Sequence, residues 1–323
     1  MTGYALDPPT EPSLFAIAGV PDRLVRDHRA DILDLPRLSA AMREAEPEVL
    51  FHLAAQSLVR EGYRDPVGTY AANVLGTAHV LEAARSEKRL AAAVVITTDK
   101  CYENREWVHP YRETDRLGGA DPYSASKACA EIVAASYRAS FFAPGTSECR
   151  IATTRAGNVI GGGDWAKDRL VPDCIRSFAK AEPVVLRYPA AVRPWQHVLD
   201  PLAGYLLLAE RLAGTGGEIH ATGWNFGPDP AGEGTVGHVS ELVARAWGDG
   251  ATVRKEPVAP GFKEAGLLRL DSTKARNELG WTPRWQLADA IAETTRWYRA
   301  WHEGADMAAY TTGQIARYAA AAS

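Results

Sequence analysis

The feature that most limits the fold of this 323-residue chain is the alternation of short apolar runs with segments of helical periodicity. The runs EVLFHLAA (48–55), AAAVVITT (91–98) and RIATTRAG (150–157) are apolar almost throughout, as is typical of strands buried on both faces. Segments with helical spacing lie between them, at 66–90 and at 122–142, and the second begins with a proline, which favours a helix N-terminus. This order predicts a doubly wound α/β fold, with a parallel sheet covered by helices on both faces.

The pattern changes after residue 160, where glycines and prolines interrupt every run. The second half is therefore predicted to be rich in loops, with two clear helices at 235–247 and 287–301. We expect a nucleotide-binding domain over 1–160. We expect a smaller substrate-binding lobe over 161–323 that returns elements to the sheet.

Composition excludes several classes of protein. The net charge of −4 and the pI near 6.1 argue against nucleic acid or an anionic membrane as a partner. No apolar run has the length of a membrane span, and the N-terminus lacks the features of a signal peptide. The four cysteines show no CxxC spacing and there is no histidine cluster, so we expect reduced thiols in a cytoplasmic protein without a metal site.

Polar side chains follow the second apolar run at the point where it ends. Thr97, Thr98, Asp99 and Lys100 place hydroxyls, a carboxylate and an ammonium in immediate succession. Ligands bind at the carboxyl ends of the strands in open parallel sheets. If the run is a strand, this segment lies at the ligand-binding edge.

A tyrosine and a lysine four residues apart, Tyr123 and Lys127, begin the helix predicted at 122–142. This spacing puts both side chains on one helix face. The phenol is a poor base at its ordinary pKa of about 10, but a neighbouring ammonium favours the phenolate, which can take a proton from an alcohol. Such a pair is common on surface helices. Thr98 at the end of the preceding strand favours a catalytic role for the pair, because Thr, Tyr and Lys together form an alcohol-oxidising triad.

Longer segments carry a family resemblance. FHLAAQSLVREGYRDP, TTDKCYENREW, DPYSASKACAE, RAGNVIGGGDWAKDRLVPD and RPWQHVLDPLAGYL resemble the extended short-chain dehydrogenases/reductases that act on nucleotide sugars, in particular the CDP-glucose 4,6-dehydratases. The resemblance extends over essentially the whole chain. It implies a Rossmann-like fold, NAD as the cofactor and a lyase that converts CDP-glucose into CDP-4-keto-6-deoxyglucose.

The resemblance also implies a role for each catalytic residue. Tyr123, assisted by Lys127, takes the proton of the sugar 4-hydroxyl while Thr98 hydrogen-bonds the developing carbonyl. Asp99 protonates the leaving 6-hydroxyl, which requires a carboxyl that stays protonated near neutral pH. Lys100 either removes the C5 proton as a buried amine of lowered pKa or stabilises the enolate as an ammonium; we favour the base.

Further positions match the family more loosely. Ala54, Ala55 and Gln56 are expected beside the nicotinamide ribose, Asp31 and Ile32 beside adenine, and Asp7 on the adenosine ribose. Thr97, Asn73, Tyr123 and Lys127 complete the expected cofactor site, although a core amide explains Asn73 almost as well. Arg193 is expected to clamp the diphosphate of the substrate. Arg169 and Arg187 are weaker candidates for the same task, and a solvated surface role explains them equally well. Asn158 resembles a family position and is expected to bind the substrate.

One departure from the family concerns the glycine-rich turn that binds the pyrophosphate after the first strand. The sequence begins at MTGYALDPPTEPSLF, which resembles the second strand of the family, about 30 residues late. Either the sequence is a fragment or starts at a misplaced codon, or it is a short form. We favour the first and expect the chain as written to be poorly stable and to bind NAD weakly.

Two other functions compete with the dehydratase. A nucleotide-sugar 4-epimerase shares the Tyr–Lys pair but needs no acid for C6, so the Asp99–Lys100 pair argues against it. A truncated relative acting as a binding protein would have no use for the retained catalytic residues. The helices near 66–85 and 122–142 carry apolar residues on more than one face, and the resemblance implies that they pair in a homodimer.

Overall fold

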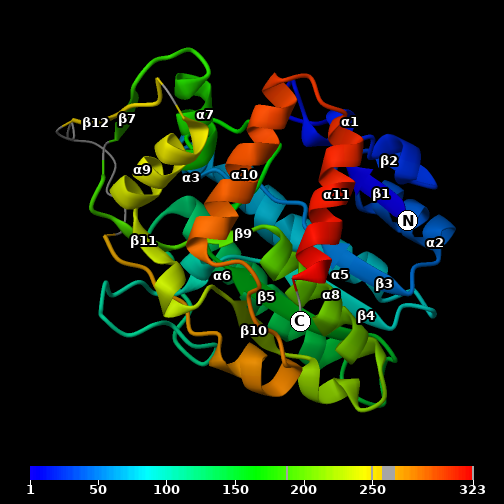
Figure 1. Ribbon diagram of the computed structural model, residues 1–323. Helices are drawn as coiled ribbons and strands as arrows, with labels where there is room; N and C mark the ends of the chain where they lie inside the picture. Colours follow the sequence, from blue (N-terminus) through cyan, green and yellow to red (C-terminus); the bar gives the residue numbers. More distant parts are fainter. Residues whose placement is uncertain (187, 249, 257–265, 322–323) are drawn as a thin grey trace.

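The computed structural model describes residues 1–186, 188–248, 250–256 and 266–321 (Figure 1). Its strands are β1 (Thr2–Ala5), β2 (Arg26–Arg29), β3 (Val49–His52), β4 (Ala92–Ile96), β5 (Arg150–Ala156), β6 (Val159–Ile160), β7 (Val184–Leu186), β8 (Val192–Pro194), β9 (Gln196–His197), β10 (Gly223–Phe226), β11 (Glu233–Thr235) and β12 (Val253–Lys255). Its α-helices are α1 (Leu14–Ile17), α2 (Leu35–Ala45), α3 (Val59–Arg64), α4 (Pro66–Tyr70), α5 (Gly76–Ala84), α6 (Pro122–Phe141), α7 (Leu170–Phe178), α8 (Leu199–Ala213), α9 (Val236–Trp247), α10 (Leu287–His302) and α11 (Met307–Ala320).

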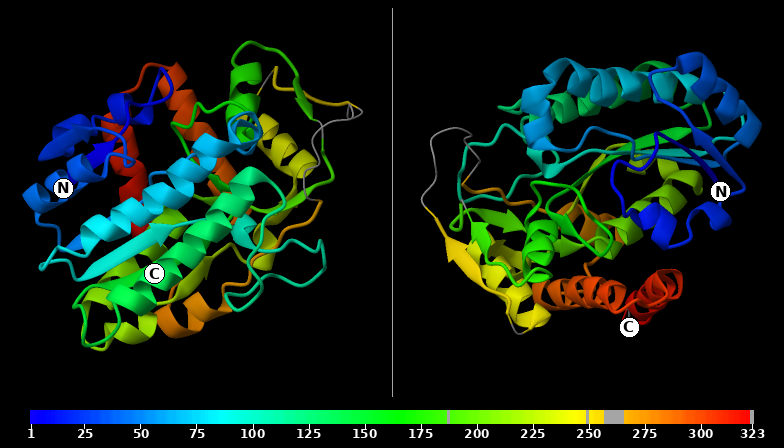
Figure 2. Two further views of the ribbon diagram at one scale, coloured as in Figure 1. Left: turned by 180° about the vertical axis from the view of Figure 1, so that it is seen from behind. Right: turned by 90° about the horizontal axis from the view of Figure 1, so that it is seen from above.

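A parallel sheet lies at the centre, with its strands in the order β10-β5-β4-β3. Helices cover both of its faces (Figure 2), so the predicted doubly wound α/β fold is confirmed. The three apolar runs of the sequence form β3, β4 and β5. Strands β1 and β2 form a separate parallel pair, and within the described residues β1 pairs only with β2 and β3 only with β4.

The packing of β4 explains why its sequence is apolar without interruption. Ala93 and Val95 pack into a core with Leu81 and other residues of α2, α5 and α6. Ala92 and Val94 pack on the opposite face against the side chains of α8 and β10. Because successive side chains of a strand point to opposite faces, a strand with helices on both sides must be apolar at every position.

Local sequence sets the start of α6, the helix that carries the Tyr–Lys pair. Asp121 caps it by accepting a hydrogen bond from the backbone N–H of Ser124 at 3.0 Å, and Pro122 occupies the first turn. The helix predicted over 66–90 is found as α4, a π-helical turn over Ala71–Leu75 and α5, and it ends at Ala84. This π turn contains Asn73, one of the predicted site residues.

The second half of the chain contributes to three cores, of which the smallest contains Leu268 and Leu270. One core joins α7, α9 and α10 around Trp195 and Trp297, and Gly162 lies so close to the Trp297 ring that no side chain fits there. Another core contains α8 and β10, which pack against the central sheet. The division of the chain at residue 160 stays a prediction.

The core on the α8 side of the sheet can be tested with two leucines of one helix. Leu208 is fully buried, whereas Leu206 is 64% exposed. We expect Leu208→Ala to lower the free energy of unfolding by about 2–5 kcal/mol, because it removes buried methyl groups and leaves a cavity. Leu206→Ala should change it by less than about 0.5 kcal/mol. Urea denaturation of both variants measures the difference, and equal losses would contradict this assignment of the two faces.

Candidate active site

The predicted site residues lie at the carboxyl ends of parallel strands. The segment 54–56 follows β3, Thr97–Lys100 follows β4, and Asn158 follows β5. Asp7 and Asp31 follow β1 and β2 in the neighbouring parallel pair. Because parallel strands end on the same side of a sheet, residues far apart in sequence gather along one edge.

Asp99 supplies the carboxyl of the turn after β4, and it is buried, with 1% of its surface exposed. Its Oδ1 accepts a hydrogen bond from the Thr98 hydroxyl at 3.1 Å, and its Oδ2 has no hydrogen-bond partner among the described residues. Burial raises the pKa of Asp99, and the nearby charges of Lys100 and Arg193 oppose this only in part. The shift is in the direction that the predicted role as an acid requires.

Gly157 makes room for this carboxyl. A side chain at Gly157 would overlap Asp99 Oδ2 and would lie 2.8 Å from Pro194 Cγ. Glycine directly after β5 thus lets the end of one strand pass close to the acid at the end of its neighbour. The sequence analysis missed this residue, although a glycine at a strand end is a signal of close backbone approach.

Tyr123 and Lys127 are both buried beside the same turn. Lys127 Nζ donates a hydrogen bond to the carbonyl of Ile96 at 3.0 Å, which holds the ammonium at the end of β4. Burial lowers the pKa of Lys127 to about 8, opposed by Glu131 and Cys101. Burial raises the pKa of Tyr123 to about 12, although a hydrogen bond with Thr98 lowers it. The sequence predicts that a neighbouring ammonium favours the phenolate; in this structure desolvation outweighs the neighbours that lower the pKa of Tyr123.

The side-chain amide of Asn73 holds the backbone of the segment after β3. Asn73 Oδ1 accepts a hydrogen bond from the backbone N–H of Gln56 at 2.8 Å, and its Nδ2 donates to the Gln56 carbonyl at 2.9 Å and to Ser126 Oγ at 2.8 Å. These contacts account for Asn73 as a core amide that fixes the 54–56 backbone to α6. Thr97 is likewise engaged in the interior, where its Oγ1 lies 2.5 Å from Glu131 Oε1.

Two exposed carboxylates, Asp7 and Asp31, follow the adjacent strands β1 and β2. The backbone carbonyl of Asp31 accepts a hydrogen bond from the Tyr4 hydroxyl at 3.0 Å, which ties the ends of the two strands together. Ile32 is buried beneath Gly76, where a side chain would collide with it. Carboxylates placed this way can accept hydrogen bonds from the hydroxyls of a ribose.

The predicted substrate arginines differ in their surroundings. Arg193 in β8 is buried and lies close enough to Asp99 to lower its pKa. Arg169 donates hydrogen bonds to Asp164 Oδ2 and Ser57 Oγ, both at 2.9 Å, and its charge lowers the pKa of Tyr123. Arg187 lies outside the described residues.

Asn158 is half-buried, and its backbone lies in the left-handed region, with φ 25°. Its Oδ1 has no hydrogen-bond partner among the described residues.

The structure brings together most of the predicted catalytic and substrate-binding residues. They are Thr98, Asp99, Lys100, Tyr123 and Lys127, with Arg169 and Arg193 near them and Asp7 and Asp31 at neighbouring strand ends. The sequence analysis missed Glu131, Arg155 and Gly157.

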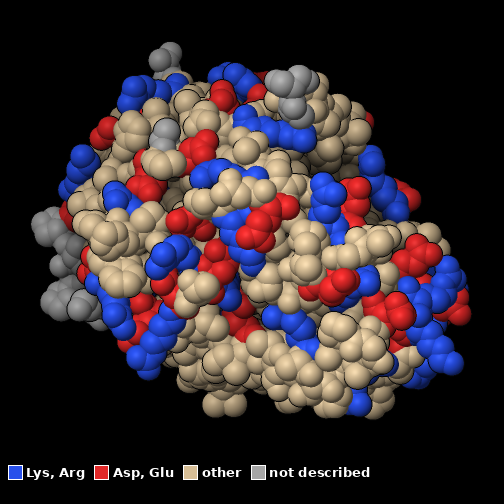
Figure 3. All heavy atoms as spheres, turned by 90° about the horizontal axis from the view of Figure 1, so that it is seen from below, with Lys and Arg blue, Asp and Glu red and all other residues tan. Residues whose placement is uncertain are grey.

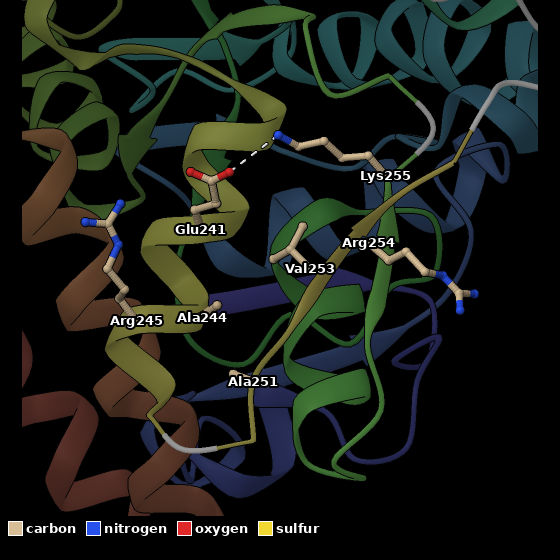
Figure 4. Close-up of a pocket in the computed structure, with 7 residues that line it drawn as sticks. All are labelled: Glu241, Ala244, Arg245, Ala251, Val253, Arg254 and Lys255. Carbon is tan, nitrogen blue, oxygen red and sulfur yellow. Dashed lines mark ion pairs between the residues drawn. The ribbon is translucent and has the colours of Figure 1, made fainter.

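A hollow of about 640 Å³ lies elsewhere, between α9 and β12 (Figure 4). An ion pair between Glu241 and Lys255 at 3.5 Å spans it, and none of the predicted site residues line it. It is therefore not the candidate active site.

The part of the chain that the structure describes contains no cluster of His, Cys, Asp or Glu arranged to hold a metal ion. None of its helices combines the length and apolarity needed to cross a membrane.

Comparison with known proteins gives the class. Residues 20–294 match the family of GDP-mannose 4,6 dehydratase, and the chain belongs to this family of sugar-nucleotide dehydratases. The membership in the extended short-chain dehydrogenases/reductases that the sequence motifs predicted is confirmed, and with it an enzyme of the lyase class.

Individual relatives agree with this class. A CDP-glucose 4,6-dehydratase from Salmonella typhimurium is 47% identical over 322 residues, which cover 99% of this chain and 89% of that protein. A dTDP-glucose 4,6-dehydratase from Streptomyces antibioticus is 32% identical over 85% of this chain and 77% of its own. Among solved structures, the dTDP-glucose 4,6-dehydratase DesIV from Streptomyces venezuelae, crystallised with NAD, superposes with a TM-score of 0.74 at 26% identity, covering 87% of this chain and 81% of that one.

The close approach at Gly157 can be tested by stability. We expect Gly157→Ala to lower the free energy of unfolding by about 1–3 kcal/mol, because the new methyl group overlaps Asp99. Gly313→Ala is the control: it lies inside α11, where the nearest atom is 3.6 Å away, and alanine there should be neutral or stabilising by up to about 1 kcal/mol. Urea denaturation compares them, and an unchanged Gly157→Ala variant would contradict the close approach.

Proposed function

We propose that this chain is an NAD-dependent CDP-glucose 4,6-dehydratase that forms CDP-4-keto-6-deoxyglucose. The observation that carries the proposal is the buried Asp99, whose pKa is raised, beside Thr98, Tyr123 and Lys127 at the carboxyl edge of the sheet. CDP-glucose is chosen as the substrate because of the relative that is 47% identical over nearly the whole chain.

The described residues fit NAD at both of its ends. Asp7 and Asp31, with Ile32, would hold the adenosine, since two exposed carboxylates at adjacent strand ends suit ribose hydroxyls. The 54–56 backbone, fixed by Asn73, would border the nicotinamide ribose together with Lys127. NAD held by these residues would supply the acceptor for the hydride of C4 and the donor of the hydride that C6 receives.

Oxidation at C4 is assigned to the residues of α6 and the end of β4. Tyr123 takes the proton of the 4-hydroxyl as the phenolate, which the Lys127 ammonium and the Thr98 hydrogen bond stabilise, and it thereby becomes the neutral phenol. Thr98 also orients the oxygen at C4. Because all three groups are buried, water competes little for these hydrogen bonds.

Elimination of water is assigned to Asp99 and Lys100. Asp99, whose pKa is raised by burial, is the proposed acid that donates a proton to the leaving 6-hydroxyl. Lys100, half-buried next to it, is the proposed base at C5, where the proton becomes acidic once C4 is a ketone. Arg193 and Arg169 are proposed to bind the diphosphate. A 4-epimerase has no step that uses a buried acid at C6, so Asp99 favours the dehydratase.

The surface charge and the cysteines support a proposal for the kind of binding partner and for the cellular compartment. Figure 3 shows side chains of both signs interspersed over one face, and together with the net charge of −4 this supports a small-molecule partner instead of nucleic acid. All four cysteines are free thiols, which supports a reducing compartment, and we propose the cytoplasm.

The substrate is tested first by mass spectrometry on CDP-, dTDP-, UDP- and GDP-glucose incubated with the chain and NAD. We expect loss of one water from CDP-glucose and little from the others. Water loss from another sugar nucleotide would correct the substrate, and water loss from none at a concentration of NAD that saturates the chain would refute the dehydratase.

Two variants separate the proposed steps. We expect Asp99→Asn to slow water loss by about 10²–10⁴-fold while C4 is still oxidised, so that the absorbance of reduced NAD accumulates. Tyr123→Phe should slow both steps, because oxidation at C4 precedes elimination. Rapid-mixing absorbance follows the oxidation at C4, and mass spectrometry follows the loss of water. An Asp99→Asn variant that dehydrates at the wild-type rate would show that Asp99 is not the acid.

The chain is also proposed to form a homodimer through α3, α4 and α6. These helices lie side by side on one face (Figure 2), and they expose Tyr63, Val67, Tyr70 and Ile132. Val67 is 78% exposed and Ile132 is 58% exposed. Apolar side chains that gather on neighbouring helices favour association, because their burial removes apolar surface from water.

A charge in this surface should separate the dimer. We expect Val67→Asp to halve the mass measured by light scattering after gel filtration, because an aspartate is costly to bury in an apolar interface. Leu206→Asp, at an exposed position of α8, is the matched control and should leave the mass unchanged. A monomeric wild-type chain, or a dimeric Val67→Asp variant, would contradict this interface.

A further inference from the structure

A third polar residue continues the face of α6 that carries Tyr123 and Lys127. Glu131 lies one turn beyond Lys127 and is 3% exposed. Its carboxylate accepts hydrogen bonds from Thr97 Oγ1 at 2.5 Å and Thr153 Oγ1 at 2.6 Å. It also accepts bonds from Arg155 Nε and Nη2, both at 2.9 Å. Four donors from β5 and the end of β4 thus converge on one buried carboxylate.

Arg155 extends the cluster beyond β5. Its Nη1 donates hydrogen bonds to the Tyr102 hydroxyl at 2.8 Å and to the Glu113 carbonyl at 3.1 Å. The Tyr102 hydroxyl in turn donates to Asn225 Oδ1 at 2.7 Å, in β10. The cluster therefore joins α6, three strands of the sheet and the segment after the active-site turn.

Glu131 stays ionised in this environment. Burial alone would raise its pKa, but the hydrogen bonds and charge of Arg155 and the hydroxyls of Thr153 and Thr97 outweigh burial and leave its pKa below the usual range. It thus carries a negative charge in the interior, one turn from the Lys127 ammonium.

The other titratable groups that face Lys127 are neutral near pH 7. Burial lowers the pKa of His52, at the end of β3, to about 3. Burial raises the pKa of the Cys101 thiol, in the turn after β4, well above its usual value. Of the groups that influence Lys127, Glu131 is therefore the charged one.

We propose that Glu131, held by Arg155, is a positioning residue for the dehydration. Through Thr97 it fixes the turn that carries Thr98 and Asp99, and its charge stabilises the Lys127 ammonium. Glu131 and Arg155 act through these neighbours and touch no reacting atom, so neither is assigned a catalytic role. The inference rests on the proposed function. The competing explanation is a purely structural ion pair, which can be replaced by neutral residues without functional loss.

The decisive variant removes both charges of the pair. Removing one partner leaves an uncompensated buried charge and destabilises a protein strongly, whereas removing both is much better tolerated. We expect the full chain with Glu131→Gln and Arg155→Met together to unfold close to the wild-type temperature. With NAD and CDP-glucose, its kcat should fall by roughly 10- to 100-fold with little change in KM.

The pKa of Lys127 gives a second test that does not depend on turnover. Titration of the lysine ε-carbons by NMR, with the Lys127 signal identified by its absence in Lys127→Arg, should show the pKa of Lys127 falling by about one unit or more in the folded double variant. Glu293→Gln is the matched control, because Glu293 is a buried carboxylate of α10 paired with Arg317 at 3.1 Å. It should change neither kcat nor the pKa of Lys127.

Wild-type kcat and an unshifted Lys127 in the folded double variant would overturn the proposal in favour of a structural pair. If the double variant does not fold, Thr97→Val tests the link to the turn while the ion pair stays intact; a lowered kcat supports the proposal and an unchanged kcat refutes it. Failure of the proposed function shows separately, as a wild-type chain that dehydrates no sugar nucleotide. The Lys127 titration in the double variant then still supports or refutes the electrostatic link.

Discussion

The burial of β4 is the constraint on which the rest of the site depends. This strand is hydrogen-bonded on both edges, to β3 and β5, and covered by apolar cores on both faces. The turn with Thr98, Asp99 and Lys100 continues directly from it, and Lys127 is anchored to its last carbonyl, that of Ile96. A rigid strand thus sets the positions of the reacting groups, which an exposed loop could not do.

Burial also sets the charge state of these groups. Asp99 tends towards the protonated acid and Lys127 towards the neutral amine for one reason, since both lose their hydration at the same edge of the sheet. The opposing charges are few and specific: Arg193 and Lys100 act on Asp99, and Glu131 acts on Lys127. One environment can therefore hold an acid beside an alcohol-oxidising pair, as a 4,6-dehydratase requires.

Several site residues could be found from the sequence because they stand where a local pattern ends. Thr98 and Asp99 follow an apolar run, and Tyr123 and Lys127 are four residues apart at a capped helix start. Glu131 and Arg155 were missed because an acid in mid-helix and an arginine in a strand are ordinary features until the fold packs them together. Gly157 was missed because only the approach of Asp99 and Pro194 shows that a side chain there has no room.

The sequence by itself determined the parallel α/β class, the alternation of β3, β4 and β5 with helices, the family and a set of candidate site residues, because periodicity and motif spacing are local properties of the chain. Only the tertiary structure decided the burial of each group, and hence the raised pKa of Asp99 and Tyr123 and the core role of Asn73. Desolvation and hydrogen bonding depend on segments distant in sequence, so no local pattern encodes them.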